Sequence, residues 1–544
     1  MNELCDIFLG AQNGSVITLH KDQIYHIYQD SCIELEGFYC SNTARKNENP
    51  TGLRRTALFL QNKKNITING NGATILLHGK ITPFLFDRCE NICVNNLTID
   101  YARPTMNEFT VLSNDNGVCM LKINKDCLYQ IKKNELIWLG ETSKKGKPYW
   151  KHYCNENKQH VKLLDPETGL FTDYNRNNLV FDKIEEIGEN IICATLKDKS
   201  VYLPKGAVIQ TRSIVRDQTG GLFQRCKNLH FENLRIKFMH GLGMVCQFCD
   251  NITYLNCDFT PNEHRTAAST ADFLQFSGCK GQITIDGIKA RGAHDDFINV
   301  HGTHLRIIKQ NKKKKSITVR FMHHESWGFQ AFEVGDKIDF IRWDTLIPYN
   351  SATVTAYERL NDTDIRLFLD KEIPSTVVLK KDVVENATYT PDLHILNCSF
   401  GLTCGRGILS TTRGKVIIEN NVFDKVWGPA LLIEDDCNFW FESGYTTEII
   451  FRNNKVHCCD YRKMYPGSPV IRYSPKVMNE SSKEFVHGKL LVEGNEFSKP
   501  AEKTHLIHLE YLKEAIIKNN TFHEPYEITQ RVVGNVVNEG NKLI

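Results

Sequence analysis

Two consecutive stretches of the chain decide its fold: NLHFENLRIK at Asn228–Lys237 and NITYLNCDFT at Asn251–Thr260. Each consists of a short β-rich run, an asparagine and a second short β-rich run. The two central asparagines, Asn233 and Asn256, lie 23 residues apart. A unit of roughly 20–30 residues that contains only strands and turns is typical of a solenoid.

The same pattern recurs along most of the chain. Asn397 and Asn420 are again 23 residues apart, whereas the longer step to Asn453 indicates loops inserted at the corners. Asparagine suits such corners because it tolerates the left-handed conformation, and Gly494 occupies the same position in KLLVEGNEF. Because successive coils would pair in parallel about 4.8 Å apart, we predict an all-β, right-handed parallel β-helix. Further copies begin at Asn65, Asn91, Gln282, Leu393, Lys415, Glu448 and Glu514.

Two long stretches interrupt the repeat. The first, 105–219, alternates polar and apolar residues, as in GVCMLKI and ENIICATLKD. The second, 303–391, contains KSITVRFM, DKIDFIRW and DIRLFLD, which are runs expected of a small antiparallel barrel or sheet. We therefore expect two inserted β-rich, barrel-like subdomains, with the coils of the β-helix at 1–104, 220–302 and 392–544.

The composition of the chain limits the kinds of binding partner and the cellular compartment that we expect. A net charge of +3 and a pI of about 8.0 argue against nucleic-acid binding, and the one dense basic run, Lys312–Lys315, is expected to be a solvated hairpin tip. No stretch approaches the ~20 apolar residues of a membrane span. The N-terminus lacks the features of a signal peptide. We expect a cytoplasmic protein, or a secreted one if a signal peptide has been removed.

The 19 cysteines do not form the pattern of a disulfide framework. Their number is odd, and the CxxC at Cys246–Cys249 has no second CxxC to complete a zinc site. Several lie within apolar strand patterns, where a free thiol packs as a small hydrophobic group. We expect core thiols and a reducing compartment.

An acidic cluster lies within ADFLQFSGCKGQITIDGIKARGAHDDFINVHG at Ala271–Gly302. Asp272 and Asp295 are one 23-residue step apart, and Asp296 follows directly. On neighbouring coils their mutual repulsion would keep one carboxyl protonated while another stays ionised. A proton donor and a base are what glycosidic-bond hydrolysis requires. The alternative is that these acids cap turns at coil corners.

At this point the chain resembles a known family. The order of one Asp and, a coil later, Asp-Asp is similar to β-helical glycosidases such as polygalacturonases. The closer resemblance is to the exo-acting α-1,3-galactosidases of glycoside hydrolase family 110. The segments that carry it are IDYARP at Ile99–Pro104, HDDFINVHG at His294–Gly302, STTRGKVIIENN at Ser410–Asn421 and LLIEDDCNFWFESG at Leu431–Gly444.

The resemblance implies inverting hydrolysis of a terminal α-linked galactose without a metal or other cofactor. The family's catalytic carboxylates correspond to Asp272, Asp295 and Asp296. By analogy with inverting β-helical hydrolases, Asp295 would be the general acid, and Asp272 and Asp296 would hold and deprotonate the attacking water.

Three further residues, Glu434, Trp440 and Glu442, are candidates for binding the sugar. An indole can cover the apolar patch of galactose, and carboxylates accept hydrogen bonds from its hydroxyl groups. The alternative is a buried tryptophan at a coil corner among solvated acids.

Other candidates have a plainer structural interpretation. His294 and His301 flank the acidic cluster, and Arg413 lies in STTRGK. A lone strand histidine is more often structural, and an arginine can cross-link ladders. His323, His324 and Trp327 of the second insert could reach over the site.

The leading hypothesis is an exo-α-galactosidase acting on a galactose-terminated oligosaccharide or glycoconjugate. The alternatives are a polygalacturonase-like hydrolase, a calcium-dependent polysaccharide lyase and a non-catalytic glycan-binding β-helix. A polygalacturonase would need more cations near the acids than Lys280, Lys289 and Arg291 provide. An exposed β-helix face or the inserted sheets could support a homodimer.

Overall fold

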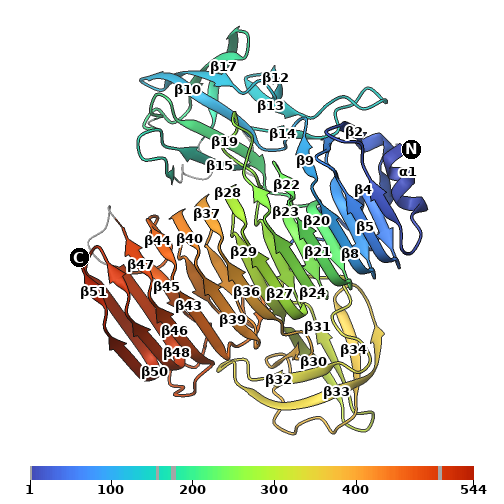
Figure 1. The fold of residues 1–544 in the computed structure, drawn as a ribbon, viewed down its shortest axis with the longest axis vertical. Coiled ribbons are helices and arrows are strands. Elements are labelled where there is room, and N and C mark those ends of the chain that lie inside the picture. Colours follow the sequence, from blue (N-terminus) through green and yellow to red (C-terminus); the bar gives the residue numbers. More distant parts are fainter. Residues whose placement is uncertain (1–2, 155–158, 173–178, 202, 500–504) are drawn as a thin grey trace.

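The protein is nearly all β, as the repeat predicts. Figure 1 shows a long stack of strands that runs from the N-terminal helix α1 (Glu3–Gly10) to β50 (Tyr526–Glu539) and β51 (Lys542–Leu543), with two inserts projecting from it. In the described part of the chain, no helix has the length and apolar character of a membrane span. The structure, a computed structural model, describes residues 3–154, 159–172, 179–201, 203–499 and 505–544.

Three parallel ladders form the stack. Each strand pairs in parallel with its counterpart in the next coil, as in Tyr254↔Ile285 and Phe276↔Val300. The predicted parallel β-helix is therefore confirmed. The coils around the site comprise β23 (Leu242–Gln247), β24 (Asp250–Leu255) and β25 (Asp258–Phe259); β26 (Leu274–Ser277), β27 (Lys280–Asp286) and β28 (Lys289–Ala293); β29 (Ile298–Thr303), β36 (Asp392–Leu396) and β37 (Ser399–Thr403); β38 (Ile408–Ser410), β39 (Lys415–Glu419) and β40 (Val422–Val426); and β41 (Leu431–Ile433), β43 (Glu448–Arg452) and β44 (Lys455–His457).

The turn asparagines occupy the conformation that the sequence pattern requires. Those of five coils have φ between +50° and +58°. Gly494 takes the same place with φ +65°, and a Cβ there would lie 2.6 Å from the side-chain oxygen of Asn453. The corner is therefore built from residues that tolerate the left-handed region. The five asparagines are Asn233, Asn256, Asn397, Asn420 and Asn453.

Inside the coils, one aromatic side chain per coil stacks on the next. The rings of Phe273 and Phe297 are parallel within 5°, with centroids 6.0 Å apart, and Phe297 continues onto Phe400 at 5.0 Å. All 19 cysteines are free and most are buried, in agreement with the expected core thiols. The stacking of Phe273 and Phe297 therefore fixes the positions of the residues that directly precede them in the chain.

The first insert is an antiparallel β structure. Its seven-stranded sheet has the order β16-β15-β19-β10-β11-β18-β17, and a three-stranded sheet, β12-β13-β14, shares its core. Coil strands resume at β20 (Thr219–Gln224). The strands are β10 (Asn107–Asp115), β11 (Val118–Ile123), β12 (Leu128–Lys132), β13 (Glu135–Leu139), β14 (Lys151–Tyr153), β15 (Gln159–Leu164), β16 (Phe171–Thr172), β17 (Phe181–Gly188), β18 (Ile191–Leu196) and β19 (Val208–Ser213).

The second insert leaves the solenoid after β29 and closes into a barrel with the order β30-β31-β34-β33-β32-β35. The lysines of 312–315 lie at the β30–β31 hairpin tip, as expected, because Asn311 pairs with Ser316. The strands are β30 (Leu305–Asn311), β31 (Ser316–Arg320), β32 (Lys337–Ile341), β33 (Pro348–Arg359), β34 (Asp364–Leu369) and β35 (Val383–Asn386).

Candidate active site

A pocket of about 540 Å³ opens beside the starts of β26, β29 and β38. Its walls come from an N-terminal loop, from the segment that follows β19, and from the loop between β41 and β42 (Glu442–Ser443). Segments far apart in the sequence therefore meet around it. The lining residues are Asn42, Arg216, Asp272, Asp295, Asp296, Asn299, Arg406, Leu409, Thr411, Glu434, Asp436, Phe439, Trp440, Glu442, Tyr465 and Lys476.

The coil register sets how the three predicted catalytic aspartates meet. Leu274 pairs with Ile298, so Asp272 stands opposite Asp296, one residue later than the 23-residue step had indicated. The difference has a local cause: the β24–β27 register shifts by one residue around Gly281, whose φ is +69°. This coil is 24 residues long, and Asp295 lies on the chain that enters β29.

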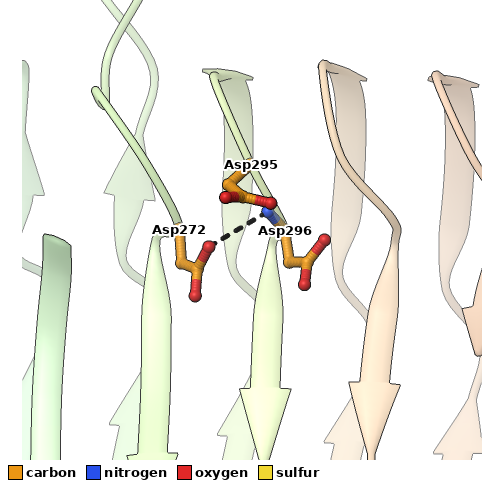
Figure 2. A group of neighbouring side chains, drawn as sticks. All are labelled: Asp272, Asp295 and Asp296. Carbon is orange, nitrogen blue, oxygen red and sulfur yellow. Dashed lines mark hydrogen bonds between the residues drawn. The ribbon is translucent and has the colours of Figure 1, made fainter. Parts of the chain in front are cut away.

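Figure 2 shows Asp272 and Asp296 at the starts of neighbouring strands, with Asp295 above them. One oxygen of each carboxylate lies within 4.8 Å of those of the other two. The backbone N–H of Asp296 donates to Asp272 Oδ1 at 3.2 Å. Asp272 and Asp296 are buried, whereas Asp295 is partly exposed at the pocket surface. The acids predicted to act together thus share one pocket.

Two arginines balance the charge of the cluster. Arg216 Nη2 lies 2.9 Å from Asp295 Oδ2, and Arg406 Nη2 lies 2.5 Å from Asp296 Oδ2. The backbone N–H of Arg406 also donates to Asp296 Oδ1 at 2.7 Å. Asp272 has no arginine in direct contact among the described residues, so its carboxyl is the one whose charge is least compensated.

Burial and repulsion separate the protonation states of the two buried carboxyls. Burial raises the pKa of Asp272 well above its usual range, and the charges of Asp295 and Asp296 raise it further. Burial likewise raises the pKa of Asp296 to about 7, although Arg406 opposes the shift. Burial and repulsion thus favour the protonated form of Asp272, while Asp296, with a pKa of about 7, is close to its midpoint at neutral pH. A buried pair of this kind can give and accept protons.

The segment after β19 is fixed next to Arg216 by Asp217, whose side chain is partly buried. Asp217 receives a salt bridge from Lys80 at 3.0 Å and contacts His240 Nε2 at 3.1 Å, and its backbone carbonyl accepts from Arg54. These charged partners hold the pKa of Asp217 well below its usual range despite burial. Arg216 is therefore presented to Asp295 by an anchored turn.

His294 supports this region from outside the pocket lining. Its Nδ1 accepts a hydrogen bond from Arg212 Nε at 3.1 Å, and its Nε2 donates to Gln210 Oε1 at 2.6 Å. Burial holds the pKa of His294 well below its usual value, so the ring is neutral. His294 connects β19 to the chain that carries Asp295, and its contacts are structural.

Three of the predicted sugar-binding residues do line the pocket. Glu434 forms an ion pair with Lys476 at 2.5 Å, and Glu442 Oε1 accepts from the Asn42 side-chain amide at 2.6 Å. Trp440 is 49% exposed rather than buried at a coil corner. These groups stand around the same opening as the triad.

His301 and Arg413, by contrast, do not belong to the pocket lining within the described chain. His301 Nδ1 donates to the carbonyl of Gly302 at 2.7 Å, and its Nε2 faces Gln275 at 3.2 Å. Arg413 forms ion pairs with Asp339 and Glu385 of the barrel. Arg413 therefore joins the barrel to the solenoid, which is the structural alternative considered for it, whereas His301 contacts Gln275 within the solenoid.

Several lining residues were not anticipated from sequence. Arg406 occupies the ladder position of Asp296 in the next coil, because Ile298 pairs with Ile408, but the second insert separates the two residues in the sequence. Arg216, Asn42, Lys476 and Tyr465 lie in segments without the repeat, and no sequence signal points to them.

The donor set of the pocket suits proton chemistry. Three carboxylates this close could also surround a cation, since hard cations prefer oxygen ligands. Two of the three, however, already face guanidinium groups, which supply the compensating charge.

Comparisons with known proteins agree with this geometry. Residues 316–384 match the GLAA-B β-barrel domain II family. The chain is 35% identical to α-1,3-galactosidase A of Bacteroides fragilis over 491 residues, which cover 89% of this chain and 78% of that protein. It is also 35% identical to α-1,3-galactosidase A of Akkermansia muciniphila over 503 residues, which cover 91% of this chain and 79% of that protein.

Among solved structures, the A-module of the Azotobacter vinelandii mannuronan C-5 epimerase AlgE6 superimposes with a TM-score of 0.36 at 9% identity, covering 99% of this chain and 93% of that one. That score is too low to support an argument. The sequence relatives, by contrast, extend over the solenoid and both inserts, and they confirm the family that the motifs resemble. The chain belongs to the α-1,3-galactosidase family, glycoside hydrolase family 110.

Proposed function

We propose that the protein is an exo-acting glycoside hydrolase that removes terminal α-1,3-linked galactose from oligosaccharides or glycoconjugates. The observation that carries the proposal is the meeting of Asp272, Asp295 and Asp296 at one pocket, with oxygens within 4.8 Å of one another. The names of relatives that are 35% identical, α-1,3-galactosidases A, support the choice of sugar and linkage.

The triad divides into one outer and two inner carboxyls. Asp295 is the more exposed, at the opening where a glycosidic oxygen would arrive, and it acts as the general acid. Asp272 and Asp296 stand side by side in register and hold the attacking water. One water can hydrogen-bond to both carboxyl groups. Their oxygens lie within 4.8 Å of each other, and two hydrogen bonds of about 2.8 Å each can span more than that separation.

In this scheme Asp296 accepts the proton of the attacking water, and Asp272 keeps its own proton and orients that water. Asp295 must carry a proton when substrate is bound, and Oδ1 can hold it while Oδ2 keeps its contact with Arg216. Attack on the side opposite the leaving group inverts the anomeric centre and releases β-galactose.

The charge of the pocket favours a neutral sugar over a uronate. The three lining cations within the described chain, Arg216, Arg406 and Lys476, are each paired with a carboxylate at 2.9 Å or less. A uronate would therefore compete with protein carboxylates for these cations.

The test is a panel of galactobiosides with α-1,3, α-1,4 and α-1,6 linkages, with released galactose measured by chromatography. We expect rapid release from the α-1,3-linked compound and at least tenfold slower release from the others. Binding without release from any of them would overturn the proposal and favour a glycan-binding β-helix.

A further inference from the structure

Two exposed aromatic side chains stand at the mouth of an otherwise polar pocket. Phe439 is 58% exposed and Trp440 is 49% exposed, and both line the same pocket as the triad. The triad lies on strands of the solenoid, whereas these rings lie on residues 434–441, which we call the aromatic loop. Apolar surface held in water is costly unless a ligand covers it.

The loop presents these rings through a fixed turn. Asp436 Oδ1 accepts from the backbone N–H of Asn438 at 2.7 Å and of Phe439 at 2.9 Å, and Asp436 Oδ2 accepts from the backbone N–H of Trp440. The backbone N–H of Asp436 in turn donates to the carbonyl of Glu442 at 3.0 Å. One buried carboxylate thus organises the residues that carry the two aromatic side chains.

The barrel fastens the same loop from outside. Arg306 Nη2 donates to the carbonyl of Cys437 at 2.7 Å, and the Asn438 side-chain amide donates to the carbonyl of Trp343 at 3.1 Å. His304 Nε2 meets buried Asp435 Oδ1 at 2.8 Å. These contacts hold the loop at several points, so the rings are pre-organised before a ligand arrives.

The barrel also contributes a ring to the surface itself. His323 packs against Trp440 with ring centroids 4.5 Å apart and an interplanar angle of 35°. Its Nδ1 accepts from the backbone N–H of Glu325 at 3.4 Å, and burial lowers the pKa of His323 to about 4, so the ring is neutral at physiological pH. Trp440 therefore lies between an apolar support and the pocket opening.

We propose that Trp440, supported by His323, is an acceptor subsite that binds the C–H face of the pyranose to which the terminal galactose is attached. The inference rests on the proposed hydrolase function. It shifts Trp440 from a platform for the galactose itself to a platform for the next sugar, because the triad is contacted by two arginines whereas the indole is half exposed. The second insert thereby contributes to the choice of glycan.

The test compares two ligands of different length on the full-length protein. In the proposed subsite arrangement, galactose fills only the part of the pocket next to the triad, so its inhibition constant measures that part. Galactosyl-α-1,3-galactose also covers the rim. For Trp440→Ala we expect the KM of the disaccharide to rise about tenfold with kcat nearly unchanged, since a lost ring contact weakens binding by about that factor. The galactose inhibition constant should change less than twofold.

Two further variants complete the experiment. Trp440→Phe keeps a flat ring and should recover most of the lost affinity. Met322→Ala removes an exposed side chain next to His323 that does not line the pocket, and it should leave both constants unchanged. Equal weakening of galactose and disaccharide in Trp440→Ala, or no weakening of either, would overturn the subsite. Absence of hydrolysis by the wild-type protein would instead refute the proposed function.

Discussion

Two corners of the coils use the same backbone scaffold in opposite ways. At the asparagine corner, Asn233 and Asn256 share one conformation and one 23-residue step, and Asn233 donates to Asn96 in the previous coil at 3.2 Å. At the opposite end of each coil, before β26 and β29, the corresponding residues are Asp272 and Asp296. The asparagine corner keeps the same residue type and backbone conformation in successive coils, whereas the residues at the second corner differ from coil to coil.

The difference shows where this solenoid places its chemistry. A repeated corner lets each coil bury its interior in the same way, as the stacked phenylalanines do. A corner that leaves the repeat is free to carry buried carboxylates, provided that neighbours compensate their charge. Arg406, from the next coil, compensates the charge of buried Asp296, and Arg216, from the segment after β19, pairs with the neighbouring Asp295.

The largest effect should come from Asp295→Asn. Loss of the general acid is expected to lower kcat on an α-1,3-galactobioside about a thousandfold, while a 2,4-dinitrophenyl α-galactoside, whose leaving group needs little protonation, is much less affected. The matched control is Asp286→Asn at the asparagine corner, where Asp286 accepts a hydrogen bond from Asn397 at 2.8 Å. We expect that control to keep full turnover. A similar loss in both variants would erase the distinction between the corners.

The next effect concerns pH. Asp296 must be ionised to accept a proton, and its pKa is about 7. As pH falls below 7, Asp296 becomes protonated, so kcat/KM, which reports on the free enzyme, should fall about tenfold per pH unit. The measurement is a kcat/KM profile from pH 5 to 8. A profile that stays flat through this range would contradict the role of Asp296 as the base.

Arg406→Gln should sharpen this assignment. Removal of the guanidinium takes away the cation that stabilises ionised Asp296, so the pKa of Asp296 should rise and the acid side of the profile should move to higher pH. At pH 7 we expect kcat/KM to be about fivefold lower if the pKa of Asp296 rises from about 7 by one unit, because about half of Asp296 is ionised at pH 7 before the change. Equal losses at all pH values would instead indicate that Arg406 only maintains the fold of the pocket.

The smallest effect on activity should come from Asn454→Ala at the asparagine corner. Buried Asn454 donates to the carbonyl of Ile418 at 2.9 Å and to Asn495 Oδ1 at 3.1 Å, and it accepts from the backbone N–H of Asn421 at 2.9 Å. Asn454→Ala leaves these groups unpaired, and we expect a loss of about 1–3 kcal/mol in stability. Thermal denaturation measures that loss, and turnover at 25 °C should stay within twofold. A large loss of turnover in a folded protein would contradict the separation of roles.

The sequence predicted the repeated parts of the molecule well, because each coil shows the same pattern of a short strand, a turn residue and a second short strand. The solenoid is indicated by the turn asparagines, such as Asn233 and Asn256. The members of the triad could then be placed on neighbouring coils by counting residues per coil. The count was one residue short between Asp272 and Asp296, because the extra residue near Gly281 interrupts the period. A single insertion of that kind has no signature in composition or alternation.

The partners of the triad were beyond reach for a different reason. Arg216 is positioned by an anchor around Asp217, Lys80 and His240, whose members come from three separate segments. Arg406 lies 110 residues after Asp296 because the barrel intervenes. Such contacts depend on how the inserts fold back on the solenoid, which local sequence patterns do not encode.

The most direct measurement is proton NMR of the free galactose released in the first minutes from the methyl β-glycoside of galactosyl-α-1,3-galactose, whose acceptor leaves as a methyl galactoside and contributes no free anomers. If Asp295 protonates the leaving oxygen while Asp272 and Asp296 deliver a water from the other side, β-galactose must appear first and the α anomer only later, by mutarotation. Initial release of α-galactose, or no release of galactose at all, would contradict the account.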